Sequence, residues 1–152
     1  AWRMVPPRPP HRTMTTAVAT SRTCSFSLAG GLITARFLPG AEVSGDDARE
    51  NLAITAGLVA GGRAPVLVDL RALKSQSPEA RAVLAGPAAA RVSRAVALLI
   101  GSPLSRVLGN FYLRVNRPET PTRLFSSEEE ARAWLAAVAD AGAPGEGGDA
   151  GR

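Results

Sequence analysis

Apolar side chains fall in two kinds of pattern along this chain, short continuous runs and runs that alternate with polar residues. The segments 65–70 (PVLVDL) and 95–100 (AVALLI) are nearly continuous, which is typical of strands covered on both faces of a parallel sheet. Residues 21–28 and 32–38 alternate instead, on either side of Ala29-Gly30-Gly31. That pattern predicts a β-hairpin at the start of the domain.

Apolar residues at helical spacing fill the segments between these runs. Ser44 and Ser77 each precede such a segment and are suited to cap a helix, and Ser127 opens an acidic capping box. A short strand is expected before the last helix, at 122–125. The predicted helices run over 44–60, 77–85, 103–115 and 127–138, with a short piece at 88–93.

The resulting order, ββαβαβαβα, predicts a single α/β domain. We expect a mostly parallel five-stranded sheet with right-handed crossovers and four main helices. Residues 1–20, rich in Pro and Arg, are predicted to be a disordered arm, and the Gly- and Ala-rich residues 140–152 a disordered tail. The domain itself is then expected at 21–139, and 152 residues suit one core.

Composition excludes several classes of function. The net charge of +5 comes without a dense basic stripe interleaved with aromatics, so nucleic acid is not expected as a partner. One cysteine, Cys24, and one histidine, His11, exclude an internal disulfide and a Cys/His metal site, and no cofactor is expected. No apolar run approaches the ~20 residues that span a bilayer. A cytoplasmic location follows as the default expectation.

Four stretches carry a resemblance to a known family: the opening hairpin with the helix after it matches in pattern only, and three stretches match in local sequence. These three are PVLVDLRALKSQSPEARAVL from residue 65, VALLIGSPLSRVLGNFYL from residue 96 and RLFSSEEEARAWL from residue 123. With the predicted order of elements, they resemble the STAS-like superfamily, and within it the small SpoIIAA-like bacterial proteins, over about 21–139. The resemblance implies a non-catalytic regulatory or protein-interaction module with an unidentified protein partner, and self-association through an open sheet edge is a further expectation.

The resemblance also implies a site at the start of the second helix. In anti-sigma antagonists a serine in an Asp-Ser-x-Gly turn is phosphorylated at that place. Here the turn contains Ser75 and Ser77, without the preceding Asp and the following Gly. Ser77 is therefore both a candidate phosphate acceptor and an ordinary helix N-cap. Glu79 and Asp69 lie close enough in sequence to oppose an added negative charge. We expect a partner to bind the loop and helix from Ser75 to Val83.

A second hypothesis is a small anionic or amphipathic ligand bound at the carboxyl ends of the parallel strands. Gly101 and Ser102 open the helix at 103, where free backbone N–H groups attract anions, and Arg106 lies one turn further on. The same Gly-Ser-Pro sequence is also an ordinary capped junction. Phe111 and Tyr112 are candidates to line a pocket for such a ligand, or else core residues.

Asp69 is the candidate for chemistry, because it ends an otherwise apolar strand. It has two interpretations, a base or a strand-end ion pair with Arg71 or Lys74. A hydrolase using Asp69 and a serine is the least favoured function, since the chain lacks a usable histidine, a cysteine cluster and a glycine-rich loop. We therefore expect no enzymatic activity.

Overall fold

The computed structural model of the protein describes residues 16–141, and at positions 104, 105, 108, 111, 112 and 141 it describes the backbone only. Its main sheet has six strands in the order β1-β2-β3-β5-β7-β8. The strands are β1 (Ala17–Thr20), β2 (Cys24–Ala29), β3 (Leu32–Phe37), β5 (Ala64–Asp69), β7 (Ser93–Leu99) and β8 (Thr122–Phe125). The pairs β1–β2 and β2–β3 are antiparallel, and the pairs from β3 to β8 are parallel.

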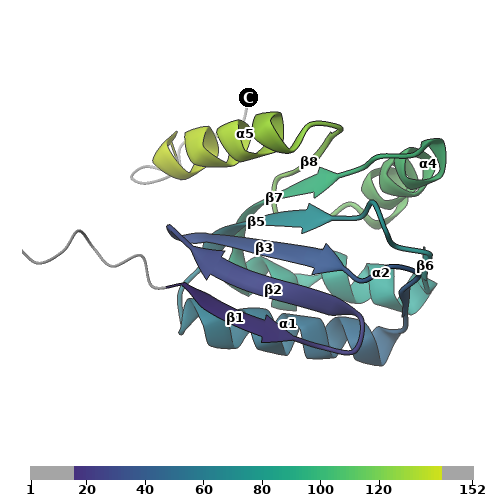
Figure 1. Ribbon diagram of the computed structural model, residues 1–152, viewed down its shortest axis with the longest axis horizontal. Helices are drawn as coiled ribbons and strands as arrows, with labels where there is room; N and C mark the ends of the chain where they lie inside the picture. The colour runs from purple at the N-terminus through teal and green to yellow at the C-terminus, as the bar shows by residue number, and fades with distance from the viewer. Residues whose placement is uncertain (1–15, 142–152) are drawn as a thin grey trace, which may run out of the picture.

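Helices cover both faces of the sheet (Figure 1). They are α1 (Gly45–Val59), α2 (Pro78–Ala85), α3 (Pro87–Val92), α4 (Pro103–Phe111) and α5 (Glu128–Ala141), and a π-helical turn, η1 (Tyr112–Asn116), continues α4. Helix α5 lies alone across one face, α1 and α2 lie across the other, and α4 follows the carboxyl end of β7. A separate pair of short parallel strands, β4 (Glu42–Val43) and β6 (Ser75–Gln76), joins the segments that precede α1 and α2.

The α/β architecture expected from the sequence is confirmed, with one strand more than predicted in the main sheet and with the separate pair β4–β6 in addition. Residues 17–20, which the sequence assigned to the arm, form β1 and pair with 25–28 of β2. This strand was missed because four residues with the sequence AVAT carry too little pattern, and its hydrogen bonds come from β2. Asp140, assigned to the tail, belongs to α5. The predictions for 1–15 and 142–152 lie outside the described residues.

Local sequence explains the two predicted turning points. Gly30 and Gly31, which join β2 to β3, have φ values of 61° and 80°, the left-handed conformation that a two-residue hairpin loop requires. The Ser44 hydroxyl accepts a hydrogen bond from the Asp47 N–H at 3.1 Å, and the Asp47 carboxylate accepts one from the Ser44 N–H at 2.9 Å. This reciprocal capping box fixes the start of α1 where the sequence predicts it.

Alternate residues of each strand divide the core between the two faces. Leu67, Leu99 and the side chain of Leu135 from α5 are fully buried on one face. On the other, Phe26, Ala35, Leu98 and their neighbours pack against α1 and α2. None of the helices between residues 16 and 141 is long and apolar enough to cross a membrane.

Candidate functional site

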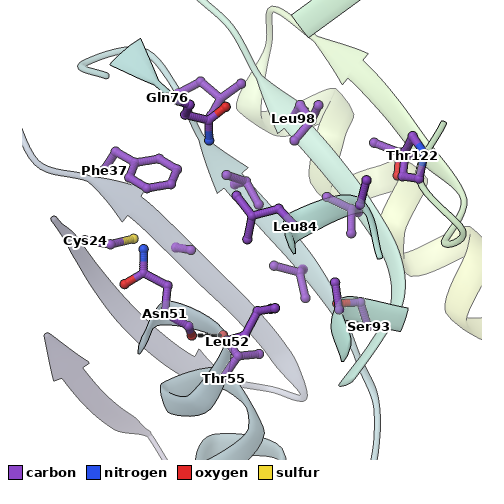
Figure 2. A pocket seen from close by; sticks show the side chains of 18 of the residues that line it. Cys24, Phe37, Asn51, Leu52, Thr55, Gln76, Leu84, Ser93, Leu98 and Thr122 are labelled. Carbon is purple, nitrogen blue, oxygen red and sulfur yellow. Dashed lines mark hydrogen bonds between the residues drawn. The ribbon is translucent and has the colours of Figure 1, made fainter. Parts of the chain in front are cut away.

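The face of the sheet that α1, α2 and α3 cover is not fully packed. A cavity of about 120 Å³ lies between β2, β3, β5 and β7 and these three helices. Figure 2 shows that its lining side chains converge from segments far apart in the sequence, including Cys24, Leu52, Leu84 and Leu98. For comparison, an engineered cavity of about 150 Å³ with aliphatic and aromatic walls binds benzene in another protein. The cavity therefore has the size of a small ring or a short chain.

Most of the cavity wall is apolar. Val66, Val68 and Leu98 contribute branched side chains from the central strands, while Leu84 and Ala89 approach from α2 and α3. Among the described residues that line it, only Glu119 carries a charge. A wall of this kind favours an uncharged apolar group, because burying an unpaired charge there would cost far more free energy than the contacts return.

Polar groups at one side of the cavity bond to one another. The Ser21 hydroxyl donates to Asn51 Oδ1 at 2.6 Å, Asn51 Nδ2 donates to Thr23 Oγ1 at 3.2 Å, and the Thr55 hydroxyl donates to the Asn51 carbonyl at 3.0 Å. The first two bonds hold α1 against the loop between β1 and β2, and the third lies within α1. Asn51 therefore has a structural role at the cavity wall, because both ends of its side-chain amide are engaged by neighbouring residues.

Other polar side chains in the wall have no partner of this kind. The Gln76 side-chain amide and the Ser93 hydroxyl line the cavity and make no hydrogen bond to any residue within 16–141. Figure 2 shows Gln76, on β6, and Ser93, at the start of β7, at separate parts of the wall. They are available to a polar group of a bound molecule.

Cys24 also lines the cavity, and burial keeps its thiol protonated and slow to react. Burial raises the pKa of Cys24 to about 12, so the side chain is a thiol and not a thiolate at neutral pH. Its sulfur donates only a weak hydrogen bond, to the Ser25 carbonyl at 3.6 Å. Cys24 acts as a small apolar wall residue.

Asp69 lies on the opposite face, at the carboxyl end of β5, in a network of arginines. Its Oδ1 accepts from the backbone N–H and Nε of Arg71, both at 3.0 Å. Its Oδ2 accepts from Arg71 Nη2 at 2.8 Å and from Arg36 Nη1 at 2.7 Å. Burial alone would raise the pKa of Asp69, but the hydrogen bonds from Arg71 and Arg36 outweigh it and lower the pKa to about 2.

Glu128 extends this network to the start of α5. Its Oε2 accepts from Arg36 Nη2 at 2.9 Å and from Arg132 Nη2 at 2.8 Å. Hydrogen bonds from Arg36 and Arg132 lower the pKa of Glu128. The network ties β3, β5 and α5 together, and with both oxygens of Asp69 engaged by guanidinium groups, this carboxylate is unsuited to accept a proton as a base.

The residues predicted to bind an anion after β7 do not gather at one point. A Cβ on Gly101 would lie 2.9 Å from Arg71 Cγ, so a larger residue at this position would displace the Arg71 side chain that binds Asp69. Ser102 lines the interior cavity. Arg106 lies exposed on α4, outside the described cavity wall. The junction therefore leaves room for the Arg71 side chain, at Gly101, and contributes one residue, Ser102, to the cavity wall.

The predicted partner loop lies at the start of α2. The Ser77 hydroxyl accepts from the Ala80 N–H at 3.0 Å, as a helix N-cap does, with Pro78 in the first turn. Ser75 is exposed on β6. Glu79 is exposed and pairs with Arg49 of α1, while its side chain packs over Gly45. The structure has Ser77 as the N-cap that the sequence predicts. Phosphorylation of Ser75 or Ser77 stays a prediction.

Three features of these sites were not predicted from the sequence. Arg36 gave a signal, because it is a charge inside an apolar strand whose parallel partner ends in Asp69. Glu128 gave none, since it sits among three consecutive glutamates. The interior cavity also gave none, because it depends on how side chains from distant segments fit together. The side chains of Phe111 and Tyr112 lie outside the described part of the structure.

The chain matches the model of a family described as domain of unknown function DUF7793 over residues 26–139. It belongs to this family. That match covers every strand from β3 onward and all five helices except the end of α5. Among proteins with a curated description, none matches this chain.

Several solved structures are similar to this chain in fold. An anti-sigma factor antagonist from Mycobacterium paratuberculosis is 15% identical, with 80% of this chain and 93% of that chain covered and a TM-score of 0.52. An uncharacterized protein of the DUF3478 family with a SpoIIAA-like fold, from Shewanella loihica PV-4, is 15% identical, with 79% and 91% covered and a TM-score of 0.47. A protein with unknown function from Arthrobacter sp. FB24 is 34% identical, with 73% and 97% covered and a TM-score of 0.29.

The fold named from the sequence is thereby confirmed: this DUF7793 chain has the SpoIIAA-like α/β fold. The likeness to the antagonist is one of fold. It identifies neither a partner nor a ligand for this chain.

Proposed function

We propose that this DUF7793 chain is a non-catalytic binding module whose interior cavity receives the apolar part of a small ligand. The observation that carries the proposal is the cavity of about 120 Å³ between the sheet and α1–α3. It reaches both loops at the carboxyl ends of β5 and β7, through Gln76 and Ser102, where folds of this kind bind ligands.

The state of the reactive side chains supports a role without catalysis. Asp69 is held by two arginines, Cys24 is a buried thiol and the Ser77 hydroxyl caps a helix. None of the three has a general base or acid beside it in the described structure that would activate it. The polar groups of the cavity, Gln76 and Ser93, are suited to orient a ligand.

The direct test fills the cavity and measures binding of a neutral aromatic probe, indole. The Ala89→Leu variant places three additional carbons at a wall position that is 8% exposed. We expect indole to raise the melting temperature of the wild-type protein and to slow the reaction of Cys24, the single cysteine, with a thiol reagent. The filled variant should lose both effects.

The matched control is Ala53→Leu, which makes the same change at an exposed position of α1 that does not line the cavity. This variant should bind indole as the wild type does. The proposal fails if indole has no effect on the wild-type protein, or if Ala89→Leu responds to indole as Ala53→Leu does while its circular dichroism spectrum stays native.

A second proposal is that the surface from Ser75 to Val83 binds a regulatory protein partner. It is favoured by the two-sided position of β6 and α2: Gln76 and Leu84 face the cavity, while Ser75 and Glu79 face solvent. Residues that line the cavity are thus sequence neighbours of residues on this surface, so a ligand in the cavity would contact the same strand and helix that the partner binds. Hydrogen exchange in the presence of fractionated native lysate should show protection confined to these residues, and unchanged exchange there would contradict the proposal.

A further inference from the structure

A second, open cleft lies beside the interior cavity. It has a volume of about 640 Å³ and runs between the carboxyl-terminal end of α1 and helix α3. Arg63 and Arg91 lie in its wall, and both are exposed. Within residues 16–141 neither guanidinium forms an ion pair, and Arg63 Nη2 donates a hydrogen bond to the Ser93 carbonyl at 3.3 Å.

The wall between the cleft and the cavity is thin. Glu119 lines both spaces. On α3, Ala89 faces the cavity and the next residue, Ala90, faces the cleft. Ser93, whose carbonyl binds Arg63, lines the cavity as well. A charged cleft and an apolar cavity are therefore separated by one short helix of small side chains and one glutamate.

The segment that carries Glu119 is held at a cost in free energy. Asn116 Oδ1 is buried without a hydrogen-bond partner in the described structure. Arg117 has a φ of 47°, the left-handed region that residues other than glycine rarely occupy. The Glu119 N–H donates to the Ala85 carbonyl at 3.3 Å. A strained segment with one backbone bond to α2 moves more readily than the strands around it.

We propose that the cavity and the cleft form one site for a small amphipathic carboxylate, whose apolar part enters the cavity and whose carboxylate binds between Arg63 and Arg91. This inference rests on the proposed function of the cavity and names the class of its ligand. The guanidinium groups supply the charge that the cavity wall lacks, and Glu119 moves aside to join the two spaces.

The carboxyl-terminal helix ends nearby give a second explanation for why Arg63 and Arg91 lie at this cleft. The carboxyl-terminal ends of α1 and α3 lie at the cleft, and cations are favoured near such ends. If that were the whole role of Arg63 and Arg91, removing either would lower stability and leave the affinity for every ligand unchanged. A binding experiment therefore separates the two accounts.

The experiment compares two series of phenyl compounds by isothermal titration calorimetry. The acids are benzoate, phenylacetate, 3-phenylpropionate and 4-phenylbutyrate, and the controls are the corresponding neutral amides. We expect the best acid to bind about tenfold more tightly than its amide, since a hydrogen bond to a charged group contributes this much. The acids should show an optimum of linker length, because the carboxylate must reach the arginines, whereas the amides should vary little.

Three variants assign the effect to residues. Arg63→Gln and Arg91→Gln should each remove most of the preference for the acid and leave the affinity for the amide unchanged. Glu119→Gln should tighten binding of the acid, because it removes a like charge. Arg114→Gln is the matched control: this exposed arginine lies on η1, outside the cavity and the cleft, and its loss should change neither affinity.

The outcomes distinguish the cavity proposal from the carboxylate proposal. If neither series binds the wild-type protein, the cavity is not a ligand site and both proposals fail. If the amides bind as tightly as the acids, the cavity stands and the carboxylate site fails. The carboxylate site also fails if Arg114→Gln lowers the affinity for the acids as much as Arg63→Gln does.

Discussion

The two faces of the sheet are built from the same strands but differ in how tightly they are packed. On the face covered by α5, Leu67, Leu99 and Leu135 are at most 1% exposed, and arginines clamp Asp69 to Glu128 at its edge. On the other face three helices cover the sheet and leave a cavity of about 120 Å³. This DUF7793 chain therefore concentrates tight packing under one helix and leaves adaptable volume under the others.

Truncating a leucine on each face gives the largest expected effect. Leu135→Ala should lower the free energy of unfolding by about 2–5 kcal/mol, because it opens a hole in a filled core. Leu84→Ala, in the wall of an existing cavity and half-buried, should cost less than half as much. Urea unfolding measures both values. Equal costs would contradict the contrast between the faces.

Adding carbon atoms tests the same contrast in the opposite direction. Ala97 is fully buried under α5, so Ala97→Leu should cost about 1–3 kcal/mol through overpacking. Ala89→Leu points into the cavity, and its stability should stay within about 1 kcal/mol of the wild type. Thermal unfolding of the two variants side by side tests this, and a larger loss for Ala89→Leu would mean that the cavity cannot accept a side chain.

The network of arginines around Asp69 and Glu128 predicts that the stability contributed by the α5 face depends on pH. Folding lowers the pKa of Asp69 from 3.8 to about 2, so its contribution is present above pH 3.8 and is lost as pH falls through about 2. After allowance for the half-exposed arginines, Asp69→Asn should cost about 1–2 kcal/mol near neutral pH. The deficit relative to the wild type should shrink between pH 4 and pH 2 in urea titrations, and a constant deficit would show that the charge is not its source.

The helix cap at the cavity side gives the smallest expected effect. Ser77→Ala removes the acceptor for the Ala80 N–H and should cost about 1 kcal/mol. Ser75→Ala, two residues away and exposed, should be neutral and serves as the control. Chemical denaturation distinguishes them. If Ser77→Ala is also neutral, the cap does not stabilise α2 and the hydroxyl is free for another role.

The fold was largely predictable because its signals are local. The continuous apolar runs at 65–70 and 95–100 became the central strands β5 and β7, and Gly30-Gly31 became the hairpin loop. The pair β4–β6 was not predictable, since each strand has two residues and their partners lie more than thirty positions apart. Edge strand β1 was missed for the same reason of length.

The candidate site was much less predictable, because it is made of contacts between distant segments. Asp69 and Arg71 are neighbours in sequence, so one of the two interpretations of Asp69 already named this ion pair. Arg36 reaches the same carboxylate only through the register of β3 against β5. The cavity has no sequence signature at all, since it is the volume that helices and strands fail to fill.

Strand β1 has a practical consequence for handling this protein. It is a four-residue edge strand, and it forms hydrogen bonds with backbone groups of β2 that would otherwise be exposed to solvent. A shortened protein that begins at residue 21 would expose the six-residue edge of β2 and invite pairing between copies, the usual start of aggregation. Soluble samples for spectroscopy or crystallisation should therefore retain the chain from residue 16 onward.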